Sequence, residues 1–170
     1  RLSAMATNVL NLSKVENQAI LRDVTTFNLS EQIRSCVLLL ENQWSRKHME
    51  LNLDFDEHNI TANEELLKQV WINLIDNAIK FTPAYGMIKI AMEPNEQQLS
   101  VSVTNTGSTI PPESMERIFQ KFYQADTSRA TAGNGVGLAI VKKVVELHKG
   151  IVRVTSQQDI TTFTVTLPIK

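Results

Sequence analysis

Apolar residues recur at helical spacing near the start of the chain. They are Leu2, Met5, Val9, Leu12 and Val15. Polar residues lie between them and the pattern ends around residues 23–26, so the segment predicts an amphipathic helix whose apolar side needs a partner. Asn28 and Glu31 then form a capping-box pattern, in which Asn28 accepts from the first helical turn and Glu31 reaches back. We expect this second helix to run to about Lys47.

The pattern then changes from a period near 3.6 to a period of two. Residues 51–55 alternate apolar and polar positions, which is typical of a half-buried strand. Asn63 and the two glutamates after it mark the start of a third helix, which continues to about Phe81 and is closed by Pro83. Residues 87–92 and 99–103 predict two adjacent antiparallel strands joined by a hairpin at residues 95–96.

The remaining segments are predicted from residue 105 onwards. We expect a loop over residues 105–113, a short helix over 113–119, a helix from Gly135 to about Lys149, and strands over 151–155 and 162–167. Residues 124–134 have no apolar period and many small or polar residues, so we expect a mobile lid there. Helices and antiparallel strands without strict β-α alternation predict an α+β fold, a two-layer sandwich.

Composition narrows the function classes. The 170 residues, 42% of them hydrophobic, suit one soluble domain, and the net charge of −1 argues against a nucleic-acid partner. Cys36 has no second cysteine to pair with and the three histidines lack metal-ligand spacing, which favours a reducing compartment. No apolar run approaches the roughly 20 residues of a membrane span, and the start at Arg1 suggests a piece of a longer protein.

The helix predicted to end at Phe81 carries an unusual polar switch. Leu66, Val70, Asn73, Asn77 and Lys80 fall on one face at about 100° per residue. The face therefore turns from apolar to amide and ammonium where core packing would be expected, and buried polar groups need partners. A bound ligand would be such a partner; the alternative is that the asparagines bond to a nearby backbone or face water.

Two further segments suggest ligand chemistry. The run from Gly133 to Leu138 places alternate glycines before an apolar helix, where free N–H groups and the helix dipole bind anions. Its spacing differs from the dinucleotide, protein-kinase and P-loop patterns, and a flexible turn is the alternative reading. Asn105 and Gly107 follow a strand, where a side-chain acceptor is able to read the amine of adenine; an ordinary turn is the alternative.

Four segments in this order closely resemble the sequence boxes of bacterial sensor histidine kinases. They are residues 73–83, 105–107, 117–123 and 133–140. The resemblance implies the Bergerat (GHKL) ATPase fold, with a mixed, mostly antiparallel sheet covered on one face by helices. It also implies that residues 1–25 are the end of the second dimerisation-hairpin helix and that residues 26–170 are the ATP-binding catalytic domain.

The resemblance assigns roles at the phosphate end of an ATP site. Asn77 would bind Mg²⁺ through its side-chain oxygen, which suits a cation that takes few protein ligands. Asn73 would position solvent or phosphate, Lys80 would neutralise phosphate charge, and Lys121 would approach the γ-phosphate. Asn73, Lys80 and Lys121 are therefore the expected catalytic residues.

The resemblance also assigns the adenine end. Asn105 would accept from the adenine amine, Gly107 would allow close approach, Ile110 would form part of the apolar wall, and Thr162 would support this network. The expected ATP-binding set is completed by Phe81, Phe122, Gly133, Asn134, Gly135, Val136, Gly137 and Leu138.

The sequence departs from the family pattern at four places. Asn105 stands where Asp is usual and gives an uncharged contact, so adenine selection should survive with lower affinity. Lys121 replaces a usual Arg and loses bidentate geometry, which would slow transfer. Thr109 replaces a common glycine, and residues 157–160 lack another.

The family's phosphate-accepting histidine motif is absent. His48 ends a helix, His58 lies in an inter-strand turn and His148 lies in the last helix, so each is read as a surface or boundary residue. We expect the chain to bind Mg-ATP without phosphorylating itself. Its expected partners are the phosphoacceptor hairpin of the same homodimeric kinase and a response-regulator receiver domain, with the chain on the cytoplasmic side of a bacterial membrane sensor.

Two other function classes remain open. One is a nucleotide-sensing module that favours a phosphatase state, in line with the altered Asn105 and Lys121. The other is a related ATPase of the gyrase, mismatch-repair or heat-shock chaperone type. Those enzymes carry a water-activating glutamate where this helix has Asn73, so slow hydrolysis is expected here.

Overall fold

A computed structural model describes residues 2–121, 123 and 136–169, with the side chains of residues 2–6 and 8 left out. Its elements are α1 (Leu2–Glu16), β1 (Val24–Asn28), α2 (Leu29–Leu39), α3 (Glu41–Arg46), β2 (Glu50–Asp54), β3 (Asn59–Asn63), α4 (Glu64–Phe81), β4 (Met87–Pro94), β5 (Gln98–Thr106), the 3₁₀ turn η1 (Pro112–Ser114), α5 (Gly137–Leu147), β6 (Ile151–Gln157) and β7 (Ile160–Pro168).

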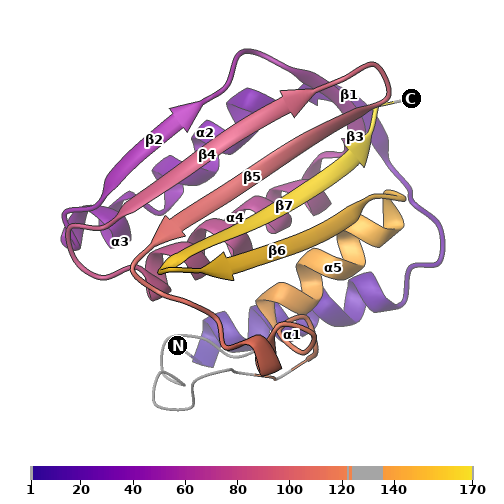
Figure 1. Ribbon diagram of the computed structural model, residues 1–170. Helices are drawn as coiled ribbons and strands as arrows, with labels where there is room; N and C mark the ends of the chain where they lie inside the picture. Colours follow the sequence, from indigo (N-terminus) through magenta and orange to yellow (C-terminus); the bar gives the residue numbers. More distant parts are fainter. Residues whose placement is uncertain (1, 122, 124–135, 170) are drawn as a thin grey trace.

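The main sheet has five strands in the order β2-β4-β5-β7-β6. The β2–β4 pair is parallel and the other pairs are antiparallel, so the sheet is mixed and mostly antiparallel. Figure 1 shows α2, α4 and α5 on one face of this sheet. The α+β two-layer fold is therefore confirmed, with a separate two-stranded β1–β3 ribbon beside it.

The core lies between the sheet and the helices. Every second residue along β4, β5 and β7 is buried, as the strand period of two requires, and Trp71 and Leu74 on α4 are almost fully buried against them. Leu12 and Val15 of α1 belong to the same apolar cluster. Helix α1 packs along α5 (Figure 1), which is how its apolar side finds the partner that the sequence requires.

Asparagine caps fix the starts of α2 and α4. Asn28 Oδ1 accepts from the Glu31 N–H at 2.9 Å, and Asn63 Oδ1 accepts from the Leu66 N–H at 2.9 Å. The first half of the predicted capping box is thus present. The second half is wrong, because the Glu31 carboxylate turns forward to the Arg34 guanidinium at 2.8 Å.

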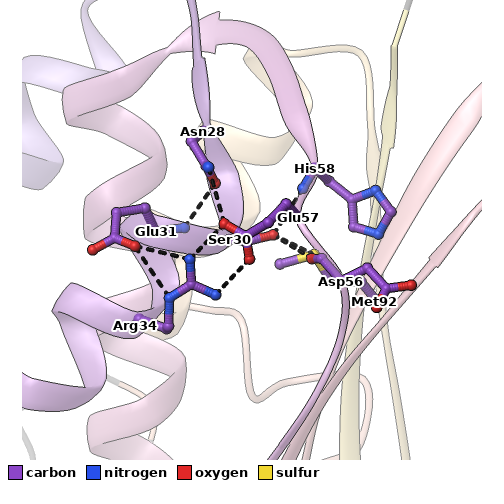
Figure 2. Close-up of polar contacts among 8 residues, drawn as sticks. All are labelled: Asn28, Ser30, Glu31, Arg34, Asp56, Glu57, His58 and Met92. Atoms are coloured by element: carbon purple, nitrogen blue, oxygen red, sulfur yellow. Dashed lines mark hydrogen bonds and ion pairs between the residues drawn. The ribbon is translucent and has the colours of Figure 1, made fainter.

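The connection between β2 and β3 is tied to the start of α2 (Figure 2). Ser30 Oγ donates to the Asp56 carbonyl at 2.6 Å and accepts from the His58 N–H at 2.9 Å. The Arg34 guanidinium also binds the Glu57 carboxylate at 2.6 Å, and this bond lowers the pKa of Glu57 to about 2. Together these contacts position α2 over the sheet edge at β2.

Three predicted segments differ from the structure. The helix expected to run from 28 to about 47 is two helices, because the backbone leaves helical geometry at Leu40 and the Trp44 indole N–H binds the Val37 carbonyl at 2.9 Å. The first helix ends at Glu16. Residues 24–28 form β1, and neither β1 nor its partner β3 is predicted by the sequence pattern. The helix expected over 113–119 is a single 3₁₀ turn followed by irregular turns.

Candidate functional site

The polar face of α4 is arranged as its period requires. Val70 is fully buried, whereas Asn73, Asn77 and Lys80, further along the same face, are half-buried. Asn73 Nδ2 donates to the carbonyl of Gln69 on the preceding turn at 2.8 Å, so one end of this amide is held by its own helix. The Asn77 side chain is half-buried on this face, and its amide oxygen is an acceptor of the kind that binds a hard cation.

Lys80 is fixed by a carboxylate one turn back on α4. Its ammonium lies 2.9 Å from Asp76 Oδ2, and both side chains are about one-third exposed. An exposed pair at this spacing contributes only about 0.3–0.5 kcal/mol. The pair therefore orients the Lys80 ammonium without binding it tightly.

The start of α5 lies against Asn73. A Cβ added at Gly137 would be 2.8 Å from Asn73 Oδ1, so a larger residue would push the Asn73 side chain away. Val136 precedes the helix without forming a side-chain cap, and it is buried while Leu138 is half-buried. The asparagine helix and the start of α5 therefore meet at Gly137. The first N–H groups of a helix are donors of the kind that bind anions. The predicted residues Gly133, Asn134 and Gly135, and the expected lid, lie outside the described residues.

Asn105 lies near the end of β5, on the helix side of the sheet. It is 3% exposed, and its Nδ2 donates to Ser108 Oγ at 3.3 Å. Gly107 has a φ of +91°, and a Cβ there would be 2.3 Å from Cδ of Pro83, just after α4. The glycine at 107 is therefore required by the packing of this loop against the end of α4, apart from any approach of adenine.

The network behind Asn105 contains Thr161 and not the predicted Thr162. Asn105 is paired across the sheet with Thr161, which is also buried, whereas Thr162 faces the opposite side of the sheet and bonds to Thr104 Oγ1 at 2.9 Å. Thr161 Oγ1 donates to the Ser108 carbonyl at 3.1 Å. Thr162 therefore lies on the other face of the sheet from Asn105, and its part in adenine binding stays a prediction. Successive strand residues point to opposite faces, so pairing Asn105 with the last strand by register would have found Thr161.

The loop beyond Asn105 is held to the hairpin formed by β6 and β7. The Ile110 N–H binds Ser156 Oγ at 2.7 Å, and Ser156 Oγ lies 2.7 Å from Thr161 Oγ1. Ile110 is half-buried, and its place in the apolar wall of an adenine pocket stays a prediction. Thr109, which replaces a common glycine, bonds through its hydroxyl to Asp159 Oδ1 at 3.2 Å.

The segment after η1 carries Lys121. The Phe119 ring packs edge-on against Phe163 of β7 with a centroid distance of 6.1 Å, which anchors the segment to the core. The Lys121 ammonium lies 3.1 Å from Glu16 Oε2, at the end of α1. Phe81, the last residue of α4, is half-buried. Phe122 lies outside the described residues.

The histidines occupy structural positions. His148 is 7% exposed; its Nε2 accepts from the Asn63 N–H at 3.1 Å, and its Nδ1 donates to the Val144 carbonyl at 2.8 Å. Burial lowers the pKa of His148, which keeps the ring neutral. His48 stacks on Tyr85 at a centroid distance of 5.1 Å. Across residues 2–121, 123 and 136–169, no group of three or more His, Cys, Asp or Glu side chains forms a metal site.

Comparison with known proteins places the chain among a large group of relatives. Residues 62–170 match the family described as histidine kinase-, DNA gyrase B-, and HSP90-like ATPase. The heme sensor protein HssS of Staphylococcus aureus is 34% identical over 169 residues, which is 99% of this chain and 36% of HssS. This chain therefore spans about a third of the length of that curated relative.

Solved structures agree with this result. The catalytic domain of histidine kinase ThkA, in a nucleotide-free form, superposes with a TM-score of 0.79 and 32% identity over 87% of this chain and 97% of that domain. ThkA in complex with the response regulator TrrA superposes with a TM-score of 0.82 and 30% identity, over 99% of this chain and 48% of that kinase chain. No described helix of this chain is both long and apolar enough to cross a membrane.

Proposed function

Because the chain belongs to the histidine kinase-, DNA gyrase B- and HSP90-like ATPase family, and within it to the catalytic domains of histidine kinases, we propose that it binds Mg-ATP and donates the γ-phosphoryl group to a histidine outside these 170 residues. The bond from the γ-phosphorus to the bridging oxygen of ADP breaks, and a bond from that phosphorus to an imidazole nitrogen forms. A response-regulator aspartate then receives the phosphoryl group.

The observation that best supports this proposal is the contact between α4 and α5. The start of α5 lies against Asn73 at Gly137, and Asn77 and Lys80 continue the same face of α4. Backbone N–H groups, amide oxygens and an ammonium are thereby gathered on one side of the helical layer. This combination suits a polyphosphate with its metal ion better than it suits a neutral ligand.

A magnesium ion fits the donor chemistry of this face. Mg²⁺ prefers hard oxygen ligands, keeps several waters and needs few protein groups, so one amide oxygen beside phosphate oxygens is sufficient. Asn77 would hold the ion, which when bound neutralises charge on the phosphates. Lys80 and Lys121 add positive charge, and Asn73 orients a phosphate oxygen or a water.

The adenine base fits the buried end of β5. The Asn105 amide is held through its Nδ2 by Ser108, and the side-chain oxygen then serves as the acceptor for the adenine amine. Thr161 replaces Thr162 in this proposal, since its hydroxyl supports Ser108 from behind. Ile110 provides apolar contact to the ring.

The division of the chain follows from the same proposal. Residues 1–25 are the end of a dimerisation-hairpin helix, and residues 26–170 are the catalytic domain. The phosphoacceptor hairpin of the homodimer supplies the histidine, and the complex of ThkA with TrrA supports a response regulator as the second partner. The resemblance to histidine kinases and to the heme sensor protein HssS supports a place on the cytoplasmic side of a bacterial membrane protein.

The alternative of a fast ATPase is disfavoured by the residue at position 73. An amide held by its own helix at Gln69 has no carboxylate to take a proton from water. We therefore expect slow ATP hydrolysis by the isolated chain, and rapid turnover would favour the chaperone and gyrase branch. A nucleotide-sensing module would bind Mg-ATP but would not transfer phosphate to a hairpin supplied in trans.

Calorimetric titration with the non-hydrolysable analogue AMPPNP, with and without Mg²⁺, tests the proposal. The parent chain should bind more tightly with Mg²⁺, and Asn77→Ala should lose most of that dependence. Asn52→Ala, an exposed position on the edge strand β2, is the matched control and should behave as the parent does. Absence of binding by the parent would refute the proposed function, and an unchanged Mg²⁺ dependence in Asn77→Ala would refute the metal assignment.

A further inference from the structure

Glu16, the last residue of α1, is paired with Lys121. The carboxylate and ammonium lie 3.1 Å apart, with side chains 42% and 49% exposed. A carboxylate at the C-terminal end of a helix is disfavoured by the helix dipole. The Lys121 ammonium offsets that cost, so the pair holds the end of α1 next to the segment that leads toward α5.

The position of Glu16 is fixed by packing. Leu12 and Val15, within one turn of Glu16, are buried in the shared core where α1 runs along α5 (Figure 1). Helix α5 in turn begins against Asn73. The Glu16 carboxylate is therefore held in place by an element outside the sheet, which packs along the helix that begins against Asn73.

We propose that Glu16 is a positioning residue that competes with the terminal phosphate of ATP for Lys121. This inference rests on the proposed function, in which Lys121 meets the γ-phosphate. The Lys121 ammonium cannot pair fully with two anions at once. Binding of the γ-phosphate therefore weakens the contact between Lys121 and Glu16 of α1. By reciprocity, any movement of α1 that withdraws Glu16 strengthens the binding of ATP.

The second paired lysine shows why this contact is special. Lys80 is paired with Asp76 on its own helix, so exchange of that partner for phosphate changes nothing outside α4. The Glu16–Lys121 pair instead joins two elements that are 105 residues apart in the sequence, counting from position 16 to position 121. Of these two pairs, it is the one that couples nucleotide binding to the helix at the start of the chain.

Glu16→Gln tests the competition in titrations with Mg-AMPPNP and Mg-ADP. Because an exposed ion pair is weak, the variant should bind AMPPNP about two- to five-fold more tightly than the parent. Binding of ADP, which lacks the γ-phosphate, should not change. Asp54→Asn is the matched control, since it removes the same charge from a carboxylate paired with Lys89 at 3.7 Å on the sheet edge.

A second substitution separates this role from general electrostatics. In a Lys121→Gln background, Glu16→Gln should no longer change AMPPNP affinity, because the competed ammonium is gone. In the parent, AMPPNP but not ADP should speed amide hydrogen exchange in the last turn of α1.

Three results would overturn the inference. Equal AMPPNP affinity of Glu16→Gln and parent would overturn it while leaving the proposed function intact. A gain shared by ADP or by Asp54→Asn would show a nonspecific charge effect and would also overturn it. Failure of the parent to bind either nucleotide would overturn both the proposed function and the inference.

Discussion

Gly137→Ala tests whether the close approach of α5 to Asn73 builds the proposed site. The new Cβ would lie 2.8 Å from Asn73 Oδ1, whereas ordinary contacts are 3.4 Å or longer, so one partner must move by about 0.6 Å. The obstructing atom is the end of a side chain, so the overpacking cost should stay near 1 kcal/mol. Alanine's better helix propensity offsets up to about 1 kcal/mol of this. The free energy of unfolding should therefore stay within about 1 kcal/mol of the parent value.

Nucleotide binding should respond much more strongly to the same substitution. A displacement of Asn73 or the α5 start by this distance disturbs the groups that we expect to meet phosphate, and loss of one hydrogen bond to a charged group costs about 1.5–3 kcal/mol of binding free energy. We expect AMPPNP affinity to fall about tenfold by calorimetry, with urea denaturation nearly unchanged.

Gly150→Ala provides the opposite control. Its Cβ would lie 2.4 Å from the Thr166 backbone carbonyl, which cannot turn aside, so the variant should lose about 2 kcal/mol or more of stability. Its folded fraction should retain parental AMPPNP affinity. The reasoning about Gly137 is refuted if Gly137→Ala binds AMPPNP as the parent does, or if its loss of affinity merely follows a loss of stability.

Two further predictions concern Thr161 and His148. Thr161→Val should weaken AMPPNP binding, and it should lower the free energy of unfolding by about 1–3 kcal/mol because the Ser108 carbonyl loses its donor. Thr162→Val should leave AMPPNP binding unchanged. Equal effects of the two substitutions on binding would return the adenine-supporting role to Thr162. Because burial lowers the pKa of His148 below 6.5, its contribution to stability is complete above pH 6.5 and is lost as the pH falls. Urea midpoints between pH 7 and 5.5 should fall more steeply for the parent than for His148→Gln, and parallel slopes would contradict this.

The sequence predicts the helical parts of the site well because their signals are local. The cap at Asn63, the apolar period and the closing proline define α4 almost to the residue, and the face carrying Asn73 and Asn77 follows from its 3.6-residue turn. The order of strands β4 and β5 likewise follows from a short polar turn. These features depend on residues that are neighbours in the chain.

The errors arise where distant residues decide the outcome. The ribbon of β1 and β3 pairs Val24 with Asn63, and neither strand is apolar enough to be seen alone. The break at Leu40 depends on the Trp44 indole reaching a carbonyl of the previous helix. The face of Thr162 depends on a register that no single strand specifies.

Charge pairing at the proposed phosphate site bears on how tightly it can hold a nucleotide. Lys80 and Lys121 are each paired with a carboxylate, Asp76 and Glu16. A bound phosphate therefore gains only the difference between the free energy of its own contact with each lysine and that of the carboxylate it replaces. Asn105 adds an uncharged contact at the adenine end, which is weaker than a carboxylate would give. All three features lower affinity in the same direction, and two of them depend on ion pairs that added salt or substitution weakens. Of the two carboxylates, Asp76 lies on α4 and Glu16 on α1. We therefore expect the occupancy of the nucleotide site to respond to the position of α1.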